Sequence, residues 1–291
     1  MFSRTRKTDF CTLIFFFFCS LSPLSAQDFY EPTDNDYRRV WSLQLGAAEG
    51  YGSYRDLGTS PMSYYGIMLQ PTLGLHLVLP SRMEFSVVSR NAVGFLEDAA
   101  DPILNFGAFD INSTFSLKAL ARIASSDSSS NIFKLYLGVG LANFLDITVN
   151  PNYENASAGI SDFMGPELIG RLYCEPRWNV PIQFHGEAAV TPIAAVLRPG
   201  YSYIDNYTAY HPVSNAFFTD FEIFAKPFAA VSTDIGIDIV TGPGSRITFS
   251  YLWNYHTTGN KGIWRFDHAT HYLAIDFLIK LRAKRSITHN P

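Results

Sequence analysis

The chain has 291 residues, of which 47% are hydrophobic, 15% are aromatic and only 16% are charged, with a formal net charge of −4. The negative charge argues against a nucleic-acid partner, and the charged fraction lies well below the roughly 25% of ordinary soluble domains. No internal stretch supplies the roughly 18 uninterrupted apolar residues of a transmembrane helix, so the apolar residues must be spread over shorter or alternating segments.

Residues 1–26 have the three parts of a secretory signal peptide. A basic start, "RTRK", precedes the apolar segment "FCTLIFFFFCSL", and "LSPLSA" ends in a small residue before Gln27. We therefore expect a cleaved signal peptide, followed by a periplasmic N-terminal segment at 27–39. A lipoprotein anchor at Cys19 is the alternative, although the aromatic residues before Cys19 fit a lipobox poorly.

Cleavage after residue 26 removes Cys11 and Cys19 and leaves Cys174 as the remaining cysteine. No internal disulfide can then form, and a cysteine-based metal site is not credible. The sequence also contains no phosphate loop, metal-binding helix motif or nucleophile elbow. We therefore predict no metal and no other cofactor.

Apolar side chains occupy every second position in six long segments. In chain order these segments are 64–79, 106–123, 132–141, 219–242, 246–255 and 271–284. In the fourth, Ile235, Ile237 and Ile239 alternate with Asp234 and Asp238. Two-residue alternation is typical of strands with chemically opposite faces. Several segments exceed the 5–6 residues of an average strand, so their apolar faces must meet a thick apolar medium.

The connections between the segments alternate in length. Short ones lie at 80–82, 125–131, 179–181 and 242–245, and long ones at about 46–63, 95–105, 148–164, 198–218 and 256–268. Short turns at one end and long loops at the other are typical of outer-membrane β-barrels. With both termini at the short-turn end, the pattern predicts ten strands, with eight or twelve as alternatives.

We therefore predict an all-β fold, a transmembrane antiparallel up-and-down β-barrel over residues 40–283 with a C-terminal tail at 284–291. The turns would be periplasmic, the loops extracellular, and the location the outer membrane of a Gram-negative bacterium. A closed barrel leaves no unpaired strand edge in lipid, which offers no hydrogen bonds. The alternative is a soluble sandwich or lipocalin-like barrel, which keeps its apolar face inside.

If the apolar face meets lipid, the charged face lines the lumen. In a barrel of about ten strands, side chains roughly fill the interior, so inward acids and bases should pair and close it. His185, beside Glu187, is interpreted as a member of this network. The charged residues predicted to point inward are Glu84, Arg90, Asp110, Lys118, Arg122, Lys134, Glu167, Arg171, Glu175, Glu187, Asp220, Glu222, Lys226, Asp234, Asp238, Arg246, Asp276, Lys280 and Arg282.

The catalytic candidates surround the last long loop. "WRFDHATHY" carries Asp267, His268 and His271, and His256 lies across the loop. A His–Asp or His–Ser pair at a barrel rim could activate water or a serine. His268 and His271 are an odd number of residues apart, so a regular strand points them to opposite sides. The competing interpretation is that these histidines only hydrogen-bond loop carbonyls.

The ligand-binding candidates lie in the fourth and first long loops. Clustered tyrosines can stack on sugars or lipid headgroups, although they also form interfacial aromatic belts. A loop with ordered turn residues and a pair of opposite charges could fold over the barrel mouth. The candidates are Tyr201, Tyr203, Asp205 and Tyr207 in the fourth loop and Arg55 and Asp56 in the first.

Several short stretches carry a family resemblance. "YRDLGTSPMSYYG", "RPGYSYIDNY" and "HATHYLAIDFLIKL" resemble an uncharacterised group of Bacteroidota-type outer-membrane barrel proteins. The resemblance implies a single-domain barrel and supplies no chemistry. "GVGLANFLDITVNPNYENASAGIS" is also similar to barrel lipid A deacylases, but their His-x-Ser-Asn motif is matched here only by "HATH", which counts against deacylation.

The preferred function is non-enzymatic. It is surface ligand binding or an accessory role in the envelope, with outer-membrane lipid, lipopolysaccharide or another envelope protein as the partner. The alternatives are a hydrolase at the barrel rim that acts on lipid or peptide, and a narrow gated solute channel. The sequence does not decide the oligomeric state.

Overall fold

The computed structural model describes residues 39–56, 63–98, 108–128, 131–149, 158–178, 180–197, 221–224, 229–242, 244–259 and 265–281. Among these residues, no helix is long and apolar enough to cross a membrane. The strands are β1 (Val40–Asp56), β2 (Ser63–Val78), β3 (Met83–Asp98), β4 (Ala108–Asp127), β5 (Asn131–Val149), β6 (Ala158–Pro176), β7 (Ile182–Thr191), β8 (Ala194–Leu197), β9 (Phe221–Phe224), β10 (Ala229–Gly242), β11 (Ser245–Thr257) and β12 (Phe266–Leu281).

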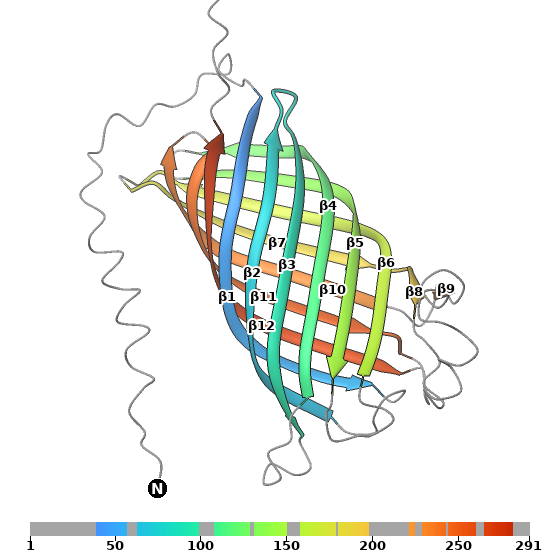
Figure 1. The fold of residues 1–291 in the computed structure, drawn as a ribbon. Coiled ribbons are helices and arrows are strands. Elements are labelled where there is room, and N and C mark those ends of the chain that lie inside the picture. Colours follow the sequence, from blue (N-terminus) through green and yellow to red (C-terminus); the bar gives the residue numbers. More distant parts are fainter. Residues whose placement is uncertain are drawn as a thin grey trace, which may run out of the picture. The chain divides into compact units, whose positions relative to one another are not determined.

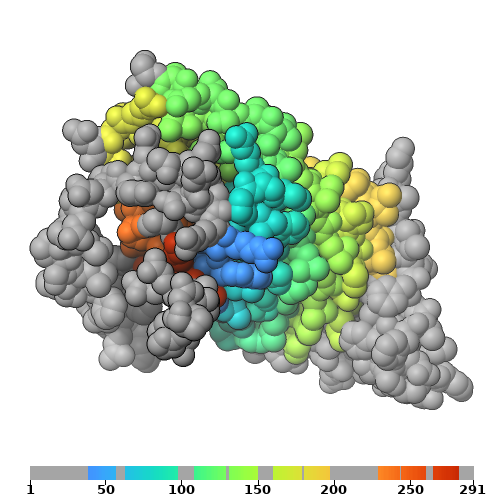
Figure 2. Space-filling view, turned by 90° about the horizontal axis from the view of Figure 1, so that it is seen from above, coloured from blue at the N-terminus to red at the C-terminus, as the bar shows by residue number. Residues whose placement is uncertain are grey.

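The strands close into one antiparallel barrel (Figure 1). Strands β1 to β7 pair in sequence order, β7 also pairs with β10, and β10, β11 and β12 continue in order. β1 pairs with β12 from Trp41 opposite Leu281 to Asp56 opposite Phe266. Figure 2 shows the two ends of the colour scale meeting there, with the blue strand against the red one. Both β7 and β8 pair with β6, so β8 extends the position of β7 in the wall. In the same way, β9 pairs with β8 and β10 pairs with β7, so β9 extends the position of β10. The twelve labelled strands therefore form a wall of ten. The predicted fold and strand number are confirmed.

The connections define two ends of the barrel. The turn end holds the connections at 79–82, 128–130, 177–181 and 243–244, together with the start of β1 and the finish of β12. The strand ends that flank 57–62, 99–107, 150–157, 198–220 and 258–265 lie at the other end, called the loop end below. The signal peptide, residues 27–38 and the tail at 284–291 lie outside the described residues.

The strands run further into the loop end than the sequence predicted. β1 continues to Asp56 and β2 already begins at Ser63, so most of the predicted first loop at 46–63 is strand. β4 has 20 residues, about twice the 9–11 that a tilted strand needs to cross a bilayer. The ladder is therefore longer than a membrane is thick.

The outer face of the barrel is apolar, as the alternation predicted. Ile235 is 60% exposed, Ile237 41% and Ile239 37%, so none of them lies under another layer of protein. On β1, the outward Trp41 and Tyr51 are both more than 40% exposed, and the strand between them rises by about 23 Å at a 45° tilt. This height matches the roughly 25 Å apolar band of outer-membrane barrels.

The inner face carries the predicted charges. The structure describes most of the charged side chains that were predicted to point inward. These residues occupy inward positions on β3–β7 and β10–β12. Lys280 is exposed at the turn end. Asp220, Lys226 and Arg282 lie outside the described residues, and the Glu222 side chain is not described.

A charged layer fills the turn-side half of the lumen. We define it as Glu84, Arg90, Lys118, Arg171, His185, Glu187, Asp234, Asp238 and Arg246. At its centre, an Arg171 nitrogen lies 2.9 Å from Glu84 on β3, and the same guanidinium pairs with Glu187 on β7. Lys118 on β4 lies 2.5 Å from the other Glu187 oxygen. These bonds link four strands across the interior.

Two apolar layers lie between the charged layer and the loop end. The layer nearer the charges contains Ala48, Met68, Ala92, Leu252, Tyr272 and Ala274. The layer nearer the loops, called the aromatic layer below, contains Tyr54, Tyr64, Leu96, Ala108, Phe144, Phe163, Ala194, Val196, Ala230 and Phe266. All of these side chains are buried, so the loop-side lumen is packed.

Glycines let the inner faces of neighbouring strands approach closely. A Cβ added to the inward Gly66 on β2 would overlap the carbonyl oxygen of Phe95 on β3, and backbone cannot move aside cheaply. At Gly186 on the outer face of β7, no described atom lies within 4 Å of the added Cβ.

We expect Gly66→Ala to lower the free energy of unfolding by about 1–3 kcal/mol, because the extra methyl overpacks the lumen. Gly186→Ala should be neutral or stabilising by up to about 1 kcal/mol, since alanine restricts the unfolded chain. Urea unfolding of the two variants in lipid vesicles makes the comparison. Equal stabilities would show that this contact does not constrain the strand spacing.

Candidate functional site

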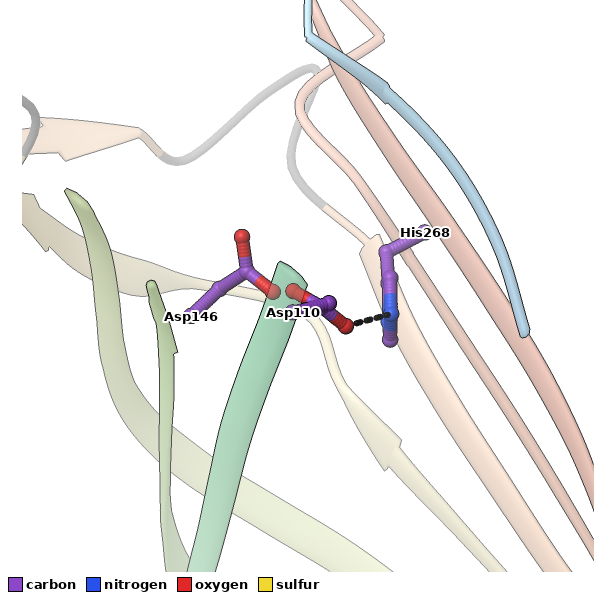
Figure 3. A group of neighbouring side chains, drawn as sticks. All are labelled: Asp110, Asp146 and His268. Atoms are coloured by element: carbon purple, nitrogen blue, oxygen red, sulfur yellow. Dashed lines mark ion pairs between the residues drawn. The ribbon is translucent and has the colours of Figure 1, made fainter. Parts of the chain in front are cut away.

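Three buried side chains meet inside the loop end of the barrel. They are Asp110 on β4, Asp146 on β5 and His268 on β12, and we call them the acid–histidine cluster. One oxygen or ring nitrogen from each lies within 4.8 Å of the others, and each side chain is at most 1% exposed. Figure 3 shows Asp110 between Asp146 and His268. The barrel thus joins segments that are far apart in the chain.

Strand register makes the two acids neighbours. Asp110 lies opposite Thr148, and Asp146 lies opposite Asn112, so the carboxylates are diagonal on the inner face. The Thr148 hydroxyl lies 3.2 Å from Asp110 Oδ1 and 3.3 Å from Asp146 Oδ2, but its single proton serves one acceptor at a time. The Asn112 amide donates to Asp110 over 3.3 Å. In the described part of the chain, neither carboxylate pairs with Lys or Arg.

Aromatic rings hold the His268 side chain in place. Its ring centroid lies 6.2 Å from that of Tyr54, 5.3 Å from that of Phe144 and 6.2 Å from that of Phe266. This packing directs Nε2 toward Asp110 Oδ2, 3.8 Å away. Within the described structure, neither ring nitrogen has a hydrogen-bond partner. Burying a polar atom without a hydrogen-bond partner costs free energy. The position of His268 would therefore be stabilised by a ligand or a proton bound to its ring nitrogens.

A second histidine lies beside the cluster. His256 on β11 is in register with His268 on β12, with the ring centroids 6.3 Å apart. The His256 ring stacks on Phe144 at 4.0 Å and 13°, which turns it toward β5 on the facing wall. It adds a second imidazole to the loop-end lumen without joining the two acids.

The structure separates the four catalytic candidates. His256 and His268 point into the lumen, whereas Asp267 and His271 point outward, as the odd spacing of His268 and His271 predicts. Asp267 accepts hydrogen bonds of 2.6 Å from both Thr257 and Arg265. His271 is hydrogen-bonded to Tyr251 on the outer face. A single site therefore cannot use all four.

The candidates from the first loop lie at the end of β1. Asp56 is fully buried and accepts a hydrogen bond of 3.2 Å from the Tyr54 hydroxyl, whereas Arg55 lies on the outer face. Asp56 also lies close enough to Asp146 to interact with it electrostatically. The fourth-loop candidates, Tyr201, Tyr203, Asp205 and Tyr207, lie outside the described residues.

His185 belongs to the charged layer, as its position beside Glu187 predicts. Its Nε2 lies 3.1 Å from Asp234, and its Nδ1 lies 3.3 Å from Asp238. Arg246 approaches Asp238 to 3.7 Å. Opposite charges therefore surround these groups, in contrast to the acids of the acid–histidine cluster.

Asp146 is the member of the cluster that sequence reasoning missed. The predicted strand at 132–141 ended before it, so Asp146 was not counted among the inward charges. The same alternation continues to Val149, and following it from the exposed Leu137, Val139 and Leu141 would have placed Asp146 inside. The approach of β12 to β4 and β5 has no local signal in the sequence.

No family model and no curated protein matches the sequence. Among solved structures, the chain is similar to the outer-membrane protease OmpT from Escherichia coli, at 9% identity and a TM-score of 0.45, covering 84% of this chain and 96% of that one. It is also similar to Neisserial surface protein A, at 10% identity and a TM-score of 0.37, covering 82% of this chain and 97% of that one. Because both TM-scores are below 0.5, we assign the fold from the strand pairing of the chain itself.

Proposed function

We propose that the chain is an integral barrel of the outer membrane that is closed to solutes and acts through its loop end. Its role would be surface ligand binding or assistance to another envelope component. The observation that carries the proposal is the contact between facing walls inside the lumen. Such contacts obstruct the lumen in the part of the barrel that the structure describes.

Contacts span the barrel at two heights, one in the charged layer and one in the aromatic layer. Arg90 on β3 lies 3.5 Å from Asp234 on β10, and these strands face each other across the ten-stranded wall. Phe144 on β5 contacts both His256 on β11 and Phe266 on β12, with ring centroids 4.0 and 6.3 Å apart. Cavities of about 40 and 60 Å³ lie beside these contacts, and one of about 170 Å³ lies nearer the turn end. Such volumes suit small groups of water molecules.

The outer face supports the membrane location. Its exposed leucines, isoleucines and phenylalanines form an apolar surface larger than soluble monomers usually expose to water. Closure of the barrel also leaves no strand edge exposed to lipid. Outer-membrane lipid is therefore the proposed partner of the barrel wall. Lipopolysaccharide or another envelope protein is the proposed partner at the loop end.

The hydrolase alternative has less support. Asp267 and His271 face outward, and His268 and Asp110 are at most 1% exposed. A general base must come within hydrogen-bond reach of its substrate, and side chains buried this deeply give a lipid or peptide no approach. The structure offers more support for a binding or accessory role.

The closed lumen predicts the electrical behaviour of the protein. After insertion of the full chain into a planar bilayer, we expect no steady conductance above the baseline, because the charged and aromatic layers block the lumen. A porin added to the same bilayer verifies detection. A stable current step at each insertion of the protein would refute the closed-lumen proposal.

A further inference from the structure

We infer that Asp110, Asp146 and His268 bind a divalent transition-metal ion inside the loop end of the barrel. Two carboxylates and one imidazole are common ligands for such ions. One ligand atom from each side chain lies within 4.8 Å of the others, and Asp110 lies between Asp146 and His268 (Figure 3). This inference concerns the interior of the barrel, so it is independent of the membrane location and of the closed lumen.

The first support is that no Lys or Arg among the described residues compensates the two acids. Asp110 and Asp146 share the hydroxyl of Thr148 and, among the described residues, pair with no Lys or Arg. In the charged layer, by contrast, Glu187 contacts both Lys118 and Arg171. Burying two carboxylates together without a cation is costly. A divalent ion would neutralise them.

The second support is the free ligand atoms. In the described structure, both ring nitrogens of His268 and the Oδ1 atom of Asp146 lack hydrogen-bond partners, although both side chains are 1% exposed. The aromatic rings of Tyr54, Phe144 and Phe266 fix the imidazole with Nε2 toward the acids. A metal ion would satisfy lone pairs on both side chains at once.

The spacing is compatible with one ion. Ligand atoms around a tetrahedral zinc ion lie about 3.4 Å apart, since each ligand bond is about 2.1 Å. The donor atoms of the cluster lie within 4.8 Å of one another, and the His268–Asp110 pair is at 3.8 Å. Carboxylate rotations that move the oxygens by about 1 Å would bring the donor atoms near the spacing of a tetrahedral zinc site.

The donor set selects the class of ion. Imidazole favours zinc and other transition metals, whereas magnesium and calcium prefer sites made only of oxygen ligands. The single imidazole with two carboxylates therefore favours Zn²⁺ or a similar ion over Mg²⁺. A shared proton between Asp110 and Asp146 is the competing explanation for the paired acids.

Calorimetric titration of the full barrel with ZnCl₂ tests the inference. The protein is folded in detergent micelles, stripped with a chelator and titrated in the presence of excess Mg²⁺. We expect one Zn²⁺ per barrel and a higher thermal unfolding midpoint when zinc is present. Absence of stoichiometric zinc binding to the wild-type barrel would overturn the inference and leave the shared proton as the explanation.

Matched variants locate the bound ion. His268→Gln and Asp146→Asn keep side-chain size close to the original and should each weaken zinc binding at least about 100-fold, because even outer-shell changes weaken it 10–100-fold. Asp276→Asn changes another buried lumen acid, outside the cluster, and should bind as the wild type does. Equal affinities in all three variants would place the ion elsewhere and refute the assignment. The prediction of no steady conductance does not depend on whether zinc binds.

Discussion

Replacing Arg171 by alanine is expected to lower the free energy of unfolding of the barrel by about 3–5 kcal/mol, the usual effect of removing one partner from a buried ion pair. The Arg171 side chain is 12% exposed and pairs with both Glu84 and Glu187. Its loss leaves two acids in the lumen with Lys118 as the remaining base bonded to Glu187. Equilibrium unfolding in urea, followed by tryptophan fluorescence in lipid vesicles, measures the change.

Arg177→Ala is the matched control. Arg177 pairs with Asp127 over 2.5 Å at the turn end, but its side chain is 44% exposed and that of Asp127 is 63% exposed. Solvent-exposed pairs contribute about 0–1 kcal/mol, so this variant should unfold close to the wild type. Two variants of equal stability would mean that the charged layer does not hold the strands together.

Ile237→Arg is expected to destabilise the barrel in lipid by about 2–4 kcal/mol, the effect of a cation at the middle of the bilayer. Ile237 lies between the exposed Ile235 and Ile239 on β10, five residues from Gly242, where β10 finishes at the turn end. Five residues at a 45° tilt rise by about 12 Å, so Ile237 lies near the middle of the apolar band. The yield of folded protein in vesicles and its urea midpoint should both fall.

Ser53→Arg tests the same change beyond the band. Ser53 is exposed on the outer face of β1, past Tyr51, where the proposed boundary leaves it in water or at the interface. Arginine there should change the free energy of unfolding by less than about 1 kcal/mol. If Ile237→Arg were equally harmless, the outer face would not lie in lipid, and the proposed membrane location would be wrong.

Alternation alone was sufficient to predict the barrel. Ile235, Ile237 and Ile239 all point outward, and Asp234 and Asp238 all point inward, as a two-residue period requires. The alternating lengths of the connections then gave the strand number. Both signals are local in the sequence, and both follow from the geometry of a pleated strand.

The loop end was harder to predict because its strands lack the usual signals. Gly46, Gly50 and Gly52 fall inside the predicted first loop at 46–63, yet all three pair with β2 and β12. Glycine is depleted in ordinary strands, but here it admits neighbours such as Tyr272 and Met68 into a narrow lumen. The extension of β1 therefore follows from the tertiary structure and not from propensity.

The acid–histidine cluster depends on closure of the sheet. Asp110 and Asp146 meet through the register of β4 and β5, and His268 reaches them from β12 across the lumen. The sequence identified His268 by its type and Asp110 by its parity, but no spacing rule relates these two positions. Candidate residues in barrels therefore become sites only when the strand register is known.

The pairing of β1 with β12 also affects how the protein is made. Trp41 on β1 pairs with Leu281 on β12. One edge of β1 therefore has no native partner strand until β12 has been synthesised. Assembly is thus governed by contacts of high sequence separation and is intrinsically slow. A chain that stops before β12 would present two unpaired edges, which are templates for aggregation, so premature termination should be far more damaging than any single substitution.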